Sequence, residues 1–180
     1  MTDILNIMQN RRSIRKFEDQ PLQEETLNQI LEAARWSQSW ANTQCWEIVV
    51  VQDPDIKEKL QETLAKGNPA SKAMVQAPVL LALCAKLETS GYYKGQVTTK
   101  HGDWYMFDLG LVTQNICLAA HALGLGSVVV GLFDHDKAEE ILNVPAGHTL
   151  AAIVPLGYPA KIPETPKRKE LTEFVHFETF

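Results

Sequence analysis

A dense group of cations lies near the start of the chain, within residues 11–17. The formal net charge of the whole chain is −5, so this positive excess is local. Neighbouring cations repel one another unless an anion or carboxylates neutralise them. A phosphate is a suitable partner, because arginine pairs with two phosphate oxygens at once and a serine hydroxyl adds a donor. The side chains that could do this are Arg11, Arg12, Ser13 and Arg15.

The same cations have a simpler interpretation, which stays open at this point. They follow a short amphipathic stretch, residues 4–8. Arg and Lys are favoured at the C-terminal ends of helices, where they meet the negative end of the helix dipole. On that reading the side chains are solvated and bind nothing.

A second polar segment, residues 37–45, is rich in hydroxyl and amide side chains and runs directly into an apolar stretch. Asn42 and Gln44 offer both donors and acceptors, which the edge of a flat heterocycle with alternating carbonyl and N–H groups requires. Local turn capping by Ser and Asn is the alternative. The number of such side chains exceeds what a turn needs, so we interpret the segment as the ring-binding part of the same ligand site. The backbone at Val130, Gly131 and Leu132 could also approach that ring, because glycine has no side chain.

Composition places the chain among ordinary globular proteins. It has 180 residues, 45% of them hydrophobic and 22% charged, which suits one domain with a sizeable core. The acidic balance argues against a nucleic-acid partner. No apolar run approaches the ~20 residues that span a bilayer, and the N-terminus lacks a signal-peptide pattern. Three widely spaced cysteines predict neither a disulfide framework nor a metal site, so we expect a cytoplasmic protein.

Periodicity predicts alternating helices and strands. Short β-branched or apolar runs predict strands at residues 46–51, 79–84, 127–130 and 150–154. Apolar spacing and capping residues predict helices after Thr2 or Asp3, after Pro21, after Asp53, over residues 104–123 and after Asp134. Residues 86–102 are polar and irregular, and could be a lid or a surface excursion. No repeat or linker is visible, so residues 1–180 are predicted to form one domain.

Two segments point to a partner subunit. Residues 104–123 are apolar nearly all round the helix, and a chain this small buries such a helix more easily with help from a second copy. Residues 160–180 contain prolines, which exclude a helix there, followed by apolar side chains that a free tail would leave exposed. We expect this arm to reach across a partner, with a short strand at residues 173–177.

Familiar catalytic patterns are missing from the sequence. Gly124-Leu125-Gly126 has a predicted helix before it and a strand after it, which is the reverse of a dinucleotide-binding fingerprint. There is no phosphate-binding P-loop and no nucleophile elbow, and the five histidines are scattered. If the protein is an enzyme, a cofactor carries the reaction.

Over nearly its full length the chain resembles the nitroreductase family of FMN-dependent oxidoreductases. The motifs follow one another in order: residues 11–17, residues 39–46, the stretch DLGLVTQNICLAAHALGLG from Asp108 to Gly126, then Gly157-Tyr158-Pro159 and the tail from Arg168. The resemblance implies an α+β fold with a mixed, largely antiparallel central sheet flanked by helices. It also implies an intertwined homodimer with FMN at its interface.

The resemblance also implies roles for individual residues. Arg11, Arg12, Ser13 and Arg15 would hold the FMN phosphate and ribityl chain, and Arg168 would return to the phosphate. The loop carrying Ser39, Trp40, Asn42 and Gln44 would reach the flavin of the other subunit. The backbone of Val130, Gly131 and Leu132 would lie along the isoalloxazine. Gln38 and Cys45 stand where the family often has prolines, which predicts a less rigid loop, and the bulky Trp40 would reshape the pocket.

The implied activity is that of an NAD(P)H oxidoreductase. NADH or NADPH would reduce FMN, which would then reduce a nitroaromatic, a quinone or a similar small acceptor in a ping-pong sequence. A flavin oxidase or reductive dehalogenase on the same fold is one alternative. A non-catalytic FMN-binding protein is another.

Overall fold

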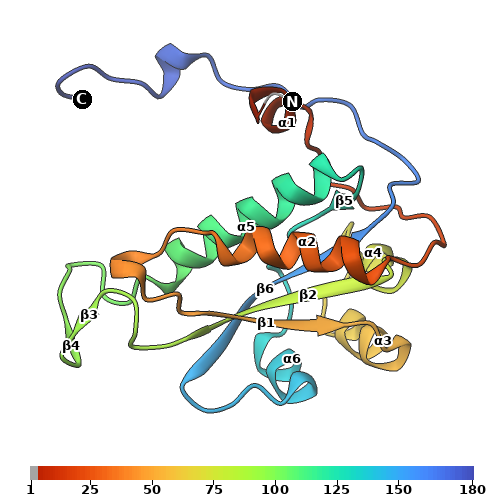
Figure 1. Cartoon of the computed structure of the whole chain (residues 1–180), viewed down its shortest axis with the longest axis horizontal. Coiled ribbons are helices and arrows are strands. Elements are labelled where there is room, and N and C mark those ends of the chain that lie inside the picture. The colour runs from red at the N-terminus through yellow and green to blue at the C-terminus, as the bar shows by residue number, and fades with distance from the viewer. Residues whose placement is uncertain (1–3) are drawn as a thin grey trace.

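A computed structural model of the protein describes residues 4–180. A four-stranded antiparallel sheet forms its centre, in the order β1-β2-β6-β5 (Figure 1). The strands are β1 (Trp46–Val51), β2 (Val79–Lys86), β5 (Gly126–Ser127) and β6 (His148–Gly157). The helices are α1 (Ile4–Asn10), α2 (Glu24–Arg35), α3 (Pro54–Glu62), α4 (Ser71–Gln76), α5 (Tyr105–Ala122) and α6 (His135–Leu142). This agrees with the predicted α+β class.

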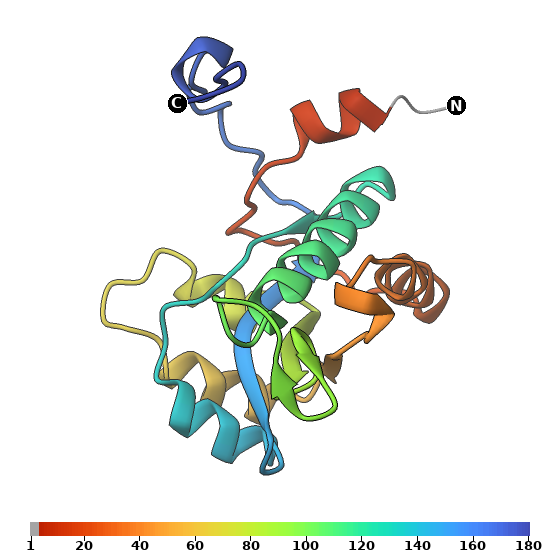
Figure 2. The same ribbon diagram turned by 90° about the vertical axis from the view of Figure 1, so that its left-hand side faces the viewer.

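Helices cover both faces of the sheet and create two core layers (Figures 1 and 2). Successive residues of a strand point to opposite faces, and β2 follows this rule along its length. Leu80, Ala82 and Cys84 belong to the layer that includes α3, α4 and α6. Leu81 and Leu83 belong to the layer formed with α2 and α5. Burial of β2 on both sides explains its continuous apolar sequence.

Helix ends follow the capping residues that the sequence offers. The Asp53 carboxylate accepts hydrogen bonds from the N–H groups of Asp55 and Ile56 and so begins α3. Asp134 begins α6 in the same way. Gly124 follows α5 with a φ of 78°, and the Leu125 N–H donates to the Ala120 carbonyl at 2.8 Å. That geometry closes the helix at the predicted glycine. The predicted caps Thr2 and Asp3 lie outside the described residues.

The cationic segment is fastened to the body by its two apolar members. Ile14 and Phe17 are buried, and the Ile14 N–H donates to the Ser127 carbonyl at 2.9 Å. Ile14 packs directly over Gly126, where an added Cβ would lie 2.5 Å from its Cγ1. Close packing at this point therefore requires a glycine at position 126. Gly126 follows α5 and begins β5, which is the order of elements that the sequence predicted. This contact fixes the path of the residues on either side of Ile14.

Three predictions of secondary structure need correction. The predicted strand at residues 127–130 is reduced to β5 and a single bridge between Val130 and Ile153. The predicted strand at residues 173–177 does not form in a single chain: a short 3₁₀ turn, η2 (Leu171–Glu173), precedes it, and within residues 4–180 the arm pairs with no strand of the sheet. Residues 86–102 contain an unforeseen hairpin, β3 (Tyr92–Tyr93) and β4 (Gln96–Val97).

A single chain covers helix α5 only in part. Leu109, Val112 and Ile116 are buried against the sheet, but Met106 and Phe107 are each 59% exposed. The arm is also exposed, and it runs past α1 away from the sheet (Figure 1). Within residues 4–180, no helix has both the length and the apolar character needed to cross a bilayer.

Candidate functional site

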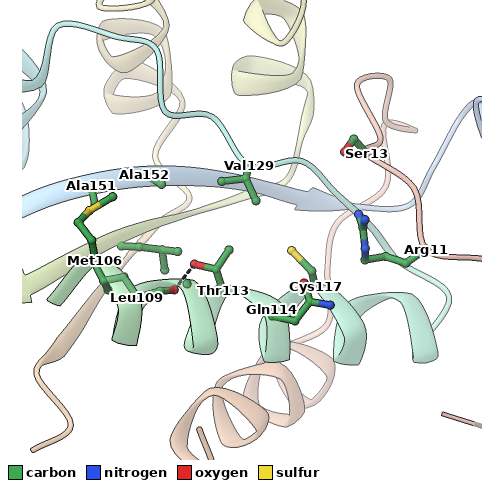
Figure 3. Close-up of a pocket in the computed structure, with 12 residues that line it drawn as sticks. Arg11, Ser13, Met106, Leu109, Thr113, Gln114, Cys117, Val129, Ala151 and Ala152 are labelled. Carbon is green, nitrogen blue, oxygen red and sulfur yellow. Dashed lines mark hydrogen bonds between the residues drawn. The ribbon is translucent and has the colours of Figure 1, made fainter. Parts of the chain in front are cut away.

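A cavity of about 320 Å³ lies along one flank of α5, between this helix, the sheet and the segment that follows β5 (Figure 3). This volume is within the range of small-molecule sites. Arg11 and Ser13 stand at one end, and Met106 stands at the other (Figure 3). From Met106 to Cys117 the helix advances by about 16 Å. The cavity therefore suits an elongated ligand with an anionic end.

The cationic segment sends its side chains to two sides. The chain is extended at residues 11–14, so alternate side chains point in opposite directions. Arg11 and Ser13 line the cavity, while Arg12 and Ile14 line a separate hollow. Arg12 donates to the carbonyls of Gln9 at 2.6 Å and Arg11 at 2.8 Å, and also to the Thr165 hydroxyl of the C-terminal arm. In a single chain, the side chains that were predicted to bind the phosphate therefore point to two different sides.

The remaining predicted cations lie at the surface. Arg15 is exposed, and its Nη1 lies 3.5 Å from the Ser13 carbonyl oxygen. Arg168 belongs to the exposed arm and does not line the cavity. Arg11 and Ser13 are consequently the members of the predicted set that a single chain brings to the cavity.

The middle of the cavity wall was not predicted from the sequence. Thr113, Gln114 and Cys117 line it from α5. Cys117 is buried, and burial raises the pKa of its thiol, although Ser127 and Arg11 partly oppose this rise. Thr113 and Gln114 are polar residues within a largely apolar helix, and that contrast was the available signal.

The segment after β5 contributes one residue to the cavity wall. Val129 lines it, whereas Val130 is buried and pairs with Ile153 through two hydrogen bonds of 2.9 Å. Gly131 and Leu132, which were predicted to lie along the ring, are exposed and do not line this cavity; within residues 4–180 their N–H groups find no acceptor. The fit to a flavin cofactor therefore rests on the elongated shape of the cavity and on Arg11 and Ser13, which suit a phosphate tail.

The amide loop has an unusual backbone. Ala41, Asn42 and Gln44 have φ values of 45°, 56° and 50°. Each left-handed residue other than glycine costs roughly 1–2 kcal/mol. The loop closes on itself, since the Gln44 N–H donates to the Ser39 hydroxyl at 2.9 Å. Contacts with residues outside the loop must therefore stabilise this backbone conformation.

Helix α5 supplies the outside contacts. Asp108 is completely buried, and it accepts hydrogen bonds from the Trp40 N–H at 3.0 Å and from the Cys45 thiol at 3.5 Å. Two turns later, the Asn115 amide donates to the Ser37 hydroxyl at 2.9 Å. Burial and the nearby Asp108 carboxylate raise the pKa of Cys45 to about 12. Asp108 and Asn115 were not predicted as site residues, although they are polar residues seven apart on one helix.

These anchors lie on the opposite flank of α5 from the cavity. At 3.6 residues per turn, Asp108 and Asn115 point about half a turn away from Met106, Thr113 and Cys117. Ser39, Trp40, Asn42 and Gln44 are accordingly separated by the helix from the cavity of their own chain. A single chain does not bring the amide loop and the cationic segment together.

Comparisons with known proteins give one consistent answer. The model of the nitroreductase family matches residues 8–158. The NADH dehydrogenase of Thermus thermophilus is 33% identical over 176 residues, with 84% of each chain covered. The FMN reductase [NAD(P)H] of Bacillus subtilis is 30% identical, covering 100% of this chain and 75% of that protein.

A solved structure agrees with these relatives. The FMN-dependent nitroreductase of Clostridium difficile R20291 has a TM-score of 0.82 and is 26% identical, with 98% of this chain and 99% of that chain covered. The fold, the order of the motifs and the extent of the family match all agree, and the chain belongs to the nitroreductase family.

Proposed function

We propose that the protein is an FMN-dependent NAD(P)H oxidoreductase that reduces nitroaromatics, quinones or similar small acceptors. The observation that carries the proposal is the elongated cavity along α5, which has Arg11 and Ser13 at one end and polar side chains, Thr113 and Gln114, along its wall. Relatives named for FMN and NAD(P)H support the same cofactor and co-substrate.

The residues of the cavity divide the binding task. Arg11 and Ser13 would neutralise and hydrogen-bond the phosphate, helped by Arg12 and Arg15 if the segment adjusts and by Arg168 if the arm folds back. Thr113 and Gln114 would face the polar chain between phosphate and ring. The backbone from Val130 to Leu132 would border the ring. When bound, FMN supplies hydride chemistry, alternating between the nicotinamide and the acceptor in a ping-pong sequence.

A homodimer would complete the site. The amide loop cannot reach the cavity of its own chain, because α5 separates them. A second copy could present its loop instead, with Ser39, Trp40, Asn42 and Gln44 meeting the ring. The exposed apolar side chains support such an association, because large exposed apolar surfaces mark interfaces. They include Leu5, Met8, Met106, Phe107, Leu171, Phe174 and Phe177.

The arm would cover the open edge of the sheet in this dimer. Strand β1 is an edge strand of the sheet, and its Val49 and Val50 are 36% and 37% exposed. An open edge is ready to pair with another extended segment. Residues 160–180 of a partner could cover it, which would bury the apolar side chains of the arm.

Spectroscopy and a coupled assay test the proposed function. The purified protein, supplied with FMN, is expected to show the visible absorption of a bound flavin. NADH or NADPH should bleach it without oxygen, and a nitroaromatic or a quinone should restore it. Bleaching that only oxygen reverses would favour a flavin oxidase. A bound flavin that neither nicotinamide reduces would leave a binding protein instead of a reductase.

A further inference from the structure

The amide loop is tied to the body through one buried carboxylate that bonds both its beginning and its end. Asp108 Oδ1 accepts from the Trp40 N–H at 3.0 Å, and Oδ2 accepts from the Cys45 thiol at 3.5 Å. We propose that Asp108 and Cys45 form a buried clamp that positions residues 39–44 to complete the flavin site of a second copy of this chain. The inference rests on the proposed function, because it takes the loop to be part of that site.

The loop needs such a clamp because its own contacts are short-range. The Asn42 N–H donates to the Ser39 carbonyl at 3.1 Å, and the Thr43 N–H donates to the Trp40 carbonyl at 2.9 Å. Ala41, Asn42 and Gln44 are left-handed and largely exposed. Left-handed residues without glycine persist only where surrounding structure determines them. Asp108 is that surrounding structure, since it lies on a different element and is fully buried.

Cys45 fixes the end of the loop through a side-chain hydrogen bond. The sequence comparison predicted a less rigid loop, because a cysteine stands where prolines are common. Proline would restrict the backbone directly. Here the buried thiol instead donates to a carboxylate. The raised pKa of Cys45, about 12, keeps the thiol protonated and able to donate throughout the neutral range.

Helix α5 thereby positions parts of two sites. Its flank with Thr113 and Cys117 lines the cavity of its own chain. Its opposite flank, through Asp108, fixes a loop that would serve the other chain. Asp108 is a positioning residue in this account, because it acts through the loop and lines no cavity.

Three substitutions test the clamp in the full-length protein. Cys45→Ala removes the donor, Cys45→Ser restores one, and Asp108→Asn keeps an acceptor for the Trp40 N–H but removes the charge. Cys84→Ala is the matched control, because Cys84 is equally buried at 3% exposed but does not contact Asp108. Thermal unfolding first establishes that each variant is folded.

Two readouts separate the clamp from a loss of stability. Hydrogen exchange of the peptide spanning residues 38–46 should quicken in Cys45→Ala and Asp108→Asn but not in Cys84→Ala. The dissociation constant for FMN, from flavin fluorescence, should rise about tenfold in the same two variants. Cys45→Ser should return both values toward those of the wild type.

The outcomes distinguish this proposal from the proposed function. Wild-type protein that binds no FMN would defeat the flavin assignment and with it the placement of the loop in a flavin site. Exchange and FMN affinity that match the Cys84→Ala control in both clamp variants would overturn the clamp alone. So would a Cys45→Ser variant that behaves like Cys45→Ala, because the thiol would then contribute no donor.

Discussion

The cationic segment and the amide loop are held in the molecule by different means. Residues 11–17 are fastened by apolar side chains within the segment itself, since Ile14 and Phe17 are buried on either side of the exposed Arg15 and Lys16. Residues 37–45 are fastened by polar groups on a helix more than sixty residues later in the chain, Asp108 and Asn115. The first segment carries its own anchors, whereas the second depends on tertiary contacts. The two segments should therefore respond differently to substitutions elsewhere in the molecule.

Removal of the apolar anchor should have the largest effect. Ile14→Ala should lower the free energy of unfolding by about 2–5 kcal/mol, because it leaves a void over Gly126. Urea denaturation measures this change. Lys16→Ala, an exposed neighbour, is the control and should stay within about 0.5 kcal/mol of the wild type. Equal losses in the two variants would contradict the assignment of Ile14 as the anchor.

The ligand-binding member of the same segment comes next. Arg11→Ala should weaken FMN binding by about 1.5–3 kcal/mol, the range for hydrogen bonds to charged groups. Arg12→Ala should cost less, because Arg12 points away from the cavity toward Thr165. Equilibrium titration of flavin fluorescence gives both values. Arg35→Ala removes an exposed arginine on α2 and controls for the loss of a positive charge. A larger loss of FMN binding in Arg12→Ala than in Arg11→Ala would contradict the placement of these two side chains.

Removal of the polar anchor of the loop should lower the free energy of unfolding by less than removal of the apolar anchor does. Asn115→Ala leaves the buried Ser37 hydroxyl without its donor and should lower the free energy of unfolding by about 1–3 kcal/mol. Chemical denaturation again provides the measurement. Asn28→Ala changes an exposed asparagine on α2 and is the matched control. If Asn28→Ala destabilised as much, the contact with Ser37 would not anchor the loop.

The smallest expected effect is a pH dependence near the cationic segment. Burial lowers the pKa of His121 from 6.5, and the nearby positive charges of Arg11 and Arg12 lower it further. Just below pH 6.5 the unfolded chain therefore binds more protons than the folded chain, so stability falls as the pH falls through that window. Thermal unfolding of the wild type and of His121→Gln, compared above and below this pH, should show a weaker dependence in the variant. An unchanged dependence would remove His121 from the account.

The same contrast explains how much the sequence could predict. Short apolar runs, capping residues and the glycine after α5 are local signals, and they located strands β1, β2 and β6, the starts of α3 and α6, and the end of α5. Asp108 could not be recognised as an anchor of the loop, because the pairing of residues 40 and 108 depends on how α5 packs. The division of Arg11 from Arg12 also required the bridge between Ser13 and Ser127.

Mixing of subunits tests most directly the claim that the site is shared between two copies of the chain. One variant carries Arg11→Ala, and the other carries Asn42→Ala with Gln44→Ala; each alone should bind FMN weakly. Refolded together in equal amounts, half of the dimers would be mixed, and each would regain one intact site. Tight FMN binding should therefore return at about a quarter of the sites, as two-fold symmetry requires. A mixture that binds no better than its separate components would contradict a shared site.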